Sequence, residues 1–142
     1  MPAVDFTLAK RATLRRLGRG LTSQIDVCDA HPELLRAARH LGLEAPEPCP
    51  VCEAEELRLI YYTFPIGQRL RRYGPGGRAH RKEDLPAMRT DPATMTCYEV
   101  EACLACSWNH LRRGFDLQKR PRTTLEDRLG ESRPRRRGSR QG

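Results

Sequence analysis

The 142-residue sequence predicts a small α+β protein in which N-terminal helices pack on an antiparallel sheet. Three observations support this. Apolar residues recur at helical spacing in residues 1–47, whereas residues 57–64 and 95–102 are rich in the β-branched and aromatic residues of strands. A Cys-x-x-Cys pair borders each strand, which favours a metal ion as a cross-link. Because only 38% of the residues are hydrophobic, such a cross-link is an expected stabiliser of a small core.

Three short helices are predicted in residues 1–47, the N-terminal helical segment. Asp5 is placed to cap the first helix. Ser23, with Asp26 three residues on, resembles a capping box for the second. A proline at the first position and a glycine after the last define the third, residues 32–41. Such a trio is typical of a helix-turn-helix, but the third helix has few polar side chains on its outer face, which favours a plain helical hairpin on the sheet.

Three strands are predicted in residues 48–117, at 57–64, 95–102 and about 107–117. Between the first two lies a stretch rich in Gly, Pro and charge, residues 66–94. We predict that this stretch is a long mobile loop with one turn of helix in its second half.

The strand at residues 95–102 alternates in character. Side chains at positions 98, 100 and 102 are apolar or aromatic, and they alternate with Cys97, Glu99 and Glu101. Successive side chains of a strand point to opposite faces. The pattern therefore predicts that one face of this strand is covered and that the other, with the two glutamates, meets water.

The net charge of +8 is unevenly distributed. Basic and acidic side chains number 7 and 6 in residues 1–47, 8 and 8 in residues 48–110, and 11 and 4 in residues 111–142. A basic tail favours a polyanionic partner, most commonly nucleic acid. The alternative is a disordered tail, residues 118–142, that is solvated and binds nothing. The candidate phosphate-contacting residues are Arg69, Arg71, Arg72, Arg78, Arg81 and Lys82 in the loop and Arg133, Arg135, Arg136 and Arg137 in the tail.

Four cysteines are the candidate ligands of a structural zinc ion: Cys49, Cys52, Cys103 and Cys106. A Cys-x-x-Cys turn aims two sulfurs at one point, and two such turns supply the tetrahedral sulfur shell that zinc prefers. Four thiolates close this shell, so no water can be activated on the ion. The N-terminus has no apolar export signal, which makes the reducing cytoplasm the expected location; there, paired cysteines are more often metal ligands or redox centres than structural disulfides.

A redox interpretation of Cys49 and Cys52 is disfavoured. The acidic residues that follow raise a thiol pKa, and a strand comes next where a thioredoxin-like site needs a βαβ unit. A redox switch in which oxidation of the cysteines releases zinc remains an alternative interpretation. Of the other cysteines, Cys28 is expected to be a buried core thiol rather than a fifth ligand. Cys97 shares its strand face with Cys103 and could approach the zinc, but an unreactive thiol is expected. His110 is the plausible substitute ligand, although packing against the neighbouring tryptophan is its expected role.

The order of cysteine pair, strand, loop, strand, cysteine pair and strand resembles a zinc ribbon over residues 48–117, with a longer loop than ribbons usually have. Over about residues 4–117 the chain is also similar to a family of small actinobacterial proteins of unknown function. This resemblance implies a folded unit of helices and ribbon and no known activity. The residues that carry it are Phe6-Thr7-Leu8-Ala9-Lys10-Arg11, Val27-Cys28-Asp29-Ala30-His31-Pro32, Cys49-Pro50-x-Cys52 and Cys103-x-x-Cys106-x-Trp108-Asn109-His110-Leu111.

These patterns favour a non-enzymatic zinc-ribbon protein that binds nucleic acid, or a nucleic-acid machine such as RNA polymerase or the ribosome. No catalytic triad, carboxylate pair or phosphate-binding loop stands out, so no small-molecule substrate is expected. No run is long and apolar enough for a membrane partner. The alternatives are a protein–protein adaptor with an inert tail and a thiol-redox or zinc-redox protein.

Overall fold

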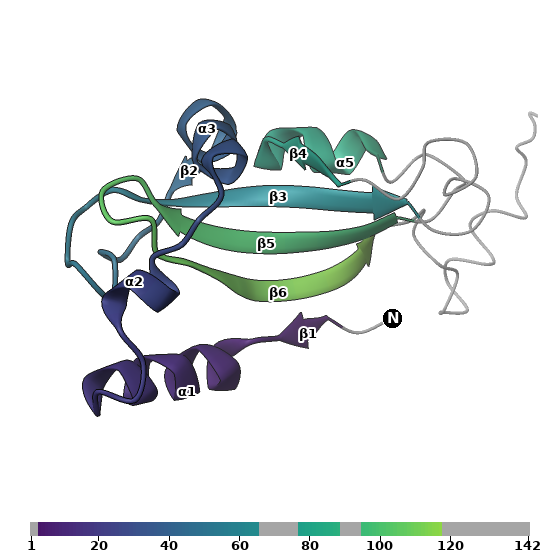
Figure 1. The fold of residues 1–142 in the computed structure, drawn as a ribbon. Helices are drawn as coiled ribbons and strands as arrows, with labels where there is room; N and C mark the ends of the chain where they lie inside the picture. The colour runs from purple at the N-terminus through teal and green to yellow at the C-terminus, as the bar shows by residue number, and fades with distance from the viewer. Residues whose placement is uncertain (1–2, 66–76, 89–94, 118–142) are drawn as a thin grey trace, which may run out of the picture.

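A computed structural model describes residues 3–65, 77–88 and 95–117 (Figure 1). Within these residues a six-stranded antiparallel sheet carries the helices, which confirms the predicted α+β class. The elements in chain order are β1 (Val4–Asp5), α1 (Thr7–Gly18), α2 (Gln24–Val27), α3 (Pro32–Leu41), β2 (Leu43–Glu44), β3 (Leu57–Pro65), β4 (Arg78–His80), the 3-10 helix η1 (Lys82–Asp84), α5 (Leu85–Met88), β5 (Met95–Cys103) and β6 (Asn109–Leu117).

Three long strands, β3, β5 and β6, form the centre of the sheet, and short strands line its edges (Figure 1). The strand order is β1-β6-β5-β3-β2, and β4 also pairs with β3. The register of β3 and β5 runs from Leu57 opposite Cys103 to Pro65 opposite Met95. Helix α3 lies against β3 and β5, and α1 lies against β6. The fully buried Ala38 of α3 allows close contact between helix and sheet.

The second and third helices match their prediction, and α2 has the reciprocal capping box of Ser23 and Asp26. The cap predicted for the first helix is corrected. Phe6 occupies the N-cap of α1 without a side-chain hydrogen bond, and Asp5, one residue earlier, accepts the N–H of Thr7 at 2.7 Å. Hydrogen bonding by Thr7 lowers the pKa of the Asp5 carboxyl. None of the helices in the described ranges has the length and apolar character that crossing a bilayer requires.

The stretch predicted as a long loop, residues 66–94, is more regular than expected in its described part, residues 77–88. It contains β4, which adds to the edge of β3, and the predicted turn of helix is α5. Leu85 of α5 is buried in a core cluster with Tyr61 of β3. The sequence around Leu85 is rich in charge, and its packing partner lies in another element, so the sequence analysis did not predict this contact. The rest of the stretch, and the tail, lie outside the residues that the structure describes.

The faces of β5 are not arranged as the alternation predicts. The face with Cys97, Glu99 and Glu101 is the more buried one: Glu99 is 6% exposed and Glu101 is fully buried. Tyr98, on the opposite face, is only half-buried. The prediction of a wet glutamate face is therefore wrong, because cations from other elements cover these carboxylates.

Glu101 accepts hydrogen bonds from a helix, a strand and the turn between β5 and β6. The donors are Lys10 Nζ of α1 at 2.7 Å, Trp108 Nε1 at 2.6 Å and Arg112 Nη1 of β6 at 3.1 Å. A buried carboxylate is tolerated only when it is paired and hydrogen-bonded, and these three donors provide that. The network therefore attaches α1 to the sheet through a charge as well as through apolar contacts.

A β-bulge brings two arginines to this face. The register of β5 and β6 shifts between Glu99 and Val100, so that Arg112 has no partner residue of its own on β5. Arg113, opposite Glu99, donates to it from Nε at 3.2 Å, and Tyr61 also donates its hydroxyl to Glu99. Burial and the hydrogen bond to this carboxylate raise the pKa of Tyr61. The bulge thus supplies the cations that the two glutamates require.

We predict that Glu101→Ala lowers the free energy of unfolding by about 3 kcal/mol, because it leaves a half-buried arginine and lysine without their carboxylate. Glu33→Ala is the control, since it removes an exposed ion pair with Arg36 and should cost less than about 1 kcal/mol. Urea denaturation followed by tryptophan fluorescence measures both. Equal losses in the two variants would show that the buried network is not a stabilising feature.

Candidate metal centre

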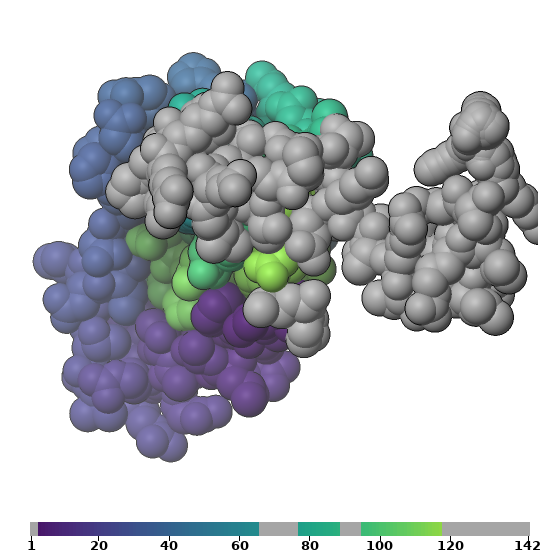
Figure 2. All heavy atoms as spheres, turned by 90° about the vertical axis from the view of Figure 1, so that its right-hand side faces the viewer, coloured from purple at the N-terminus to yellow at the C-terminus, as the bar shows by residue number. Residues whose placement is uncertain are grey.

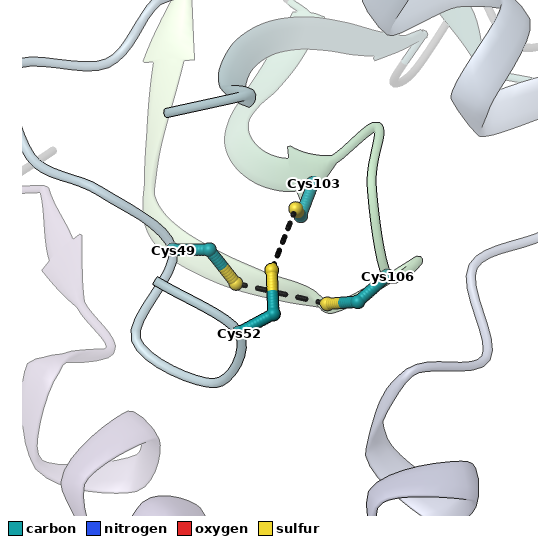
Figure 3. Close-up of side chains that lie close together, drawn as sticks. All are labelled: Cys49, Cys52, Cys103 and Cys106. Atoms are coloured by element: carbon teal, nitrogen blue, oxygen red, sulfur yellow. Dashed lines mark hydrogen bonds between the residues drawn. The ribbon is translucent and has the colours of Figure 1, made fainter. Parts of the chain in front are cut away.

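The four cysteines predicted as zinc ligands converge at one end of the sheet (Figure 3). The four sulfur atoms all lie within 4.8 Å of one another. Cys49 and Cys52 come from the turn before β3, whereas Cys103 and Cys106 come from the turn between β5 and β6. Since β3 and β5 are paired up to Leu57 and Cys103, their register brings the two turns together.

The two turns, which we name the first knuckle (residues 49–54) and the second knuckle (residues 103–108), share one hydrogen-bond pattern. In each, the first cysteine exchanges backbone hydrogen bonds with the fifth and sixth residues, and its sulfur accepts the N–H of the third. The bonds are Glu53 N to Cys49 O, Cys49 N to Ala54 O and Val51 N to Cys49 Sγ, and Ser107 N to Cys103 O, Cys103 N to Trp108 O and Ala105 N to Cys103 Sγ. Each cysteine pair is thus pre-set by its own backbone.

The fifth residue of each knuckle has a left-handed backbone. Glu53 has φ of 65° and Ser107 has φ of 72°, and they are the residues other than glycine with positive φ in the described ranges. This conformation costs a residue with a Cβ about 1–2 kcal/mol. Strain at the same position of both turns indicates that closing the knuckles stabilises the fold enough to offset it.

The sulfur positions fit a tetrahedral metal ion. The sulfurs of Cys49 and Cys106 are 3.7 Å apart, and so are those of Cys52 and Cys103. Zinc–sulfur bonds of about 2.3 Å in a tetrahedron place the sulfurs about 3.8 Å from one another. None of these four cysteines is in a disulfide. The donor set and its spacing are therefore those of a closed four-thiolate site.

The protein environment alone favours thiols over thiolates at most of these positions. Burial raises the pKa of Cys49 and Cys103, and it raises that of Cys106 to about 12. At Cys52, burial also raises the pKa, but the Ala54 N–H and the neighbouring thiols outweigh it, so the net shift is downward. Grouping thiols in a low-dielectric site has a cost that a bound divalent cation reverses, because it stabilises the thiolate form.

The centre is built into a core cluster. Cys49, Leu57, Cys103 and Trp108 are buried together, and Leu14 of α1 packs against them. His110 does not join the sulfurs: its ring stacks on Trp108 at 5.8 Å, which confirms the expected packing role.

The two remaining cysteines differ in position. Cys97 lies in the other core cluster with Leu85 and Met95, away from the sulfurs. Cys28 packs at the cluster of the knuckles, as a core thiol would, but its Sγ also lies 3.5 Å from Cys106 Sγ. Sequence reasoning disfavoured Cys28 as a fifth ligand and did not predict this contact, because no spacing rule relates a cysteine at the end of a short helix to a knuckle in the sheet.

Of the predicted nucleic-acid-binding residues, the structure describes three. Arg78 in β4, Arg81 before η1 and Lys82 in η1 are exposed and lie near one another in sequence. The other predicted contacts, Arg69, Arg71, Arg72, Arg133, Arg135, Arg136 and Arg137, lie outside the described residues.

Comparison with known proteins places the chain in a family. A model of a family of unknown function (DUF5318) matches residues 2–131. The chain belongs to this family. Uncharacterized proteins of Mycobacterium tuberculosis and of Mycobacterium bovis are 37% identical to it over 114 residues, which cover 80% of this chain and 80% of each relative. No solved structure matches the chain. The predicted resemblance to a family of unknown function is confirmed, and the family name carries no activity.

We predict that the purified protein contains one zinc ion per chain and that a strong chelator removes it together with the near-UV circular dichroism of the buried Trp108. Cys103→Ser should have the same effect because it removes a ligand, whereas Cys97→Ser, in the other core cluster, should keep the zinc. Metal analysis and circular dichroism measure these outcomes. Unchanged near-UV signals after chelation would contradict the prediction.

We predict that Ser107→Gly raises the free energy of unfolding by about 0.5–1 kcal/mol, because glycine adopts the left-handed conformation without the Cβ penalty. Ser107→Val should lower it, since a β-branched residue fits this region worst. Thermal unfolding of the zinc-loaded variants measures both. Opposite signs for the two substitutions are expected, and a destabilised glycine variant would count against knuckle strain.

Proposed function

We propose that this protein is a non-enzymatic zinc-ribbon protein whose ion is structural. The spacing of the four sulfurs carries this proposal. All lie within 4.8 Å of one another, and the two pairs that join the knuckles are 3.7 Å apart, as in a tetrahedral shell of thiolates. Such a shell has no open position for water or substrate, which supports a structural ion over a catalytic one. The two knuckles lie 51 residues apart from Cys52 to Cys103, so the ion would join distant parts of a chain with a small core.

We infer that the partner is nucleic acid, or a nucleic-acid machine such as RNA polymerase or the ribosome. The charge distribution supports this. The described residues carry 13 basic and 14 acidic side chains, whereas the remaining residues carry 13 and 4. The described part of the chain is thus nearly neutral, and the basic excess of the protein belongs to the remaining residues. Basic segments of this kind contact phosphates without reading sequence.

These segments attach to one end of the sheet. Pro65 ends β3 opposite Met95, which begins β5, and Met95 is opposite Leu117, which ends β6. This end of the sheet, which faces the viewer in Figure 2, therefore holds described residues that border segments 66–76, 89–94 and 118–142. The exposed cations Arg78 and Arg81 follow directly after the first of these segments. A shared attachment point supports one electrostatic contact region opposite the metal centre.

We predict that deleting residues 118–142 weakens binding to both single-stranded RNA and duplex DNA and reduces the salt dependence of what remains, because fewer phosphates are neutralised. A full-length variant with Arg133, Arg135, Arg136 and Arg137 changed to Gln is the matched control, since it keeps the length of the tail. Fluorescence anisotropy over a salt series measures both. If the intact protein binds neither nucleic acid at low salt, the nucleic-acid proposal fails.

A protein–protein adaptor is the second candidate, and one surface favours it. On the face opposite the buried glutamates, an open groove of about 460 Å³ is lined almost wholly by carbon. Phe64 and Tyr98, which both line it, meet edge to face with ring centroids 5.8 Å apart. An exposed apolar groove of this kind is typical of a protein-binding surface. Its lining includes Phe6, Leu34, Tyr62, Phe64, Tyr98 and Leu111.

A further inference from the structure

A fifth sulfur lies directly beside the four-sulfur shell. The Cys28 thiol donates to Cys106 Sγ at 3.5 Å, a separation no longer than those within the shell. Cys28 is nevertheless not part of the group in which every sulfur lies within 4.8 Å of every other. It is therefore a thiol in contact with one proposed ligand that is not itself needed to complete a tetrahedron.

Backbone and side-chain contacts hold Cys28 in this place. Cys28 is the C-cap of α2, where its N–H donates to Gln24 O at 2.8 Å. The two residues that follow are bonded to the second knuckle and the strand after it. Ala30 N donates to Ser107 O at 3.0 Å, and Asn109 Nδ2 donates to Asp29 Oδ1 at 3.0 Å. These contacts hold the backbone of Cys28 beside the second knuckle, which places its thiol within reach of Cys106.

Cys28 and Cys106 are more exposed to solvent than the two most buried cysteines of the shell. Cys49 and Cys103 are 1% and 0% exposed, whereas Cys28 and Cys106 are half-buried. A small solute such as hydrogen peroxide can therefore reach Cys106 at the edge of the shell more readily than it reaches the two buried sulfurs. Oxidation of a cysteine depends on such access, and a second thiol in contact favours a disulfide as the product.

We propose that Cys28 and Cys106 are a peroxide-sensitive pair whose disulfide opens the zinc shell. The inference rests on the proposed zinc centre. The Cys106 thiolate attacks one peroxide oxygen, the O–O bond breaks and hydroxide leaves, which gives a sulfenic acid at Cys106. The Cys28 sulfur then attacks Cys106 Sγ, its proton leaves with the hydroxyl group as water, and the S–S bond forms. Two electrons pass from the two sulfurs to the peroxide, and with one proton from solvent two waters result.

Loss of Cys106 removes one of the four thiolates. Three cysteines bind zinc more weakly than four, and the second knuckle then holds the ion through Cys103 alone. Because binding energy at a structural site is folding energy, release of the ion loosens the contact between the knuckles. The pair thus makes the fold respond to peroxide, with Cys28 as the thiol that resolves the oxidised ligand.

The test treats the zinc-loaded full-length protein with hydrogen peroxide and follows zinc release with a chromophoric chelator, after which non-reducing peptide mapping locates the disulfides. We expect a peptide pair that links Cys28 to Cys106. In Cys28→Ser, zinc release should be slower on the order of tenfold, because the sulfenic acid has lost its resolving thiol. Cys97→Ser is the matched control and should release zinc as the unsubstituted protein does. Zinc content before peroxide is added tests the zinc centre separately from the inference.

Two results would overturn the inference. The first is zinc release from Cys28→Ser at the unsubstituted rate. The second is a peptide map with Cys49–Cys106 or Cys52–Cys103 in place of the expected link. Cys28→Ala is a second variant, for the case that serine disturbs the site. If both variants lack zinc before oxidation, Cys28 belongs to the shell, and the resolving role is likewise excluded.

Discussion

The convergence of four sulfurs from two knuckles is the constraint on which the rest of the structure depends. Each knuckle closes on its own backbone hydrogen bonds, and the pairing of Leu57 with Cys103 brings them to the same end of the sheet. A second contact, from Leu104 N to Glu56 O at 3.0 Å, joins the second knuckle to the short link between the first knuckle and β3. These bonds position the thiols, whereas burial opposes their ionisation. A cation bound at the centre of the sulfurs would remove this opposition and would join the two local turns in one cross-link.

Trp108 joins this centre to the other polar feature of the core. Its carbonyl accepts the N–H of Cys103, and its indole donates to the buried Glu101. Glu101 in turn holds Lys10 of α1 and Arg112 of the bulge. In a chain with few apolar residues, ion pairs and thiols thus fill part of the core that apolar side chains fill in a larger domain. The Glu101 side chain consequently couples the position of α1 to the bulge in β6 and to the second knuckle.

How far the sequence predicts the structure depends on how local each signal is. Some features depend on only a few neighbouring residues, and these are present as predicted: the capping box of α2, the bounds of α3 and the two Cys-x-x-Cys turns. The buried face of β5 was mispredicted because the partners of its glutamates lie elsewhere: Lys10 is 91 residues from Glu101. The contact of Cys28 with Cys106 spans 78 residues and was missed for the same reason. Patterning reports the polarity of a residue but not the cation that neutralises it.

X-ray absorption spectroscopy at the zinc edge of the purified full-length protein tests the central claim most directly, because it reports the identity and distance of the ligands. The account predicts a single shell of four sulfurs at about 2.3 Å. A shell that contains nitrogen or oxygen, or a protein purified under reducing conditions without zinc, would contradict it.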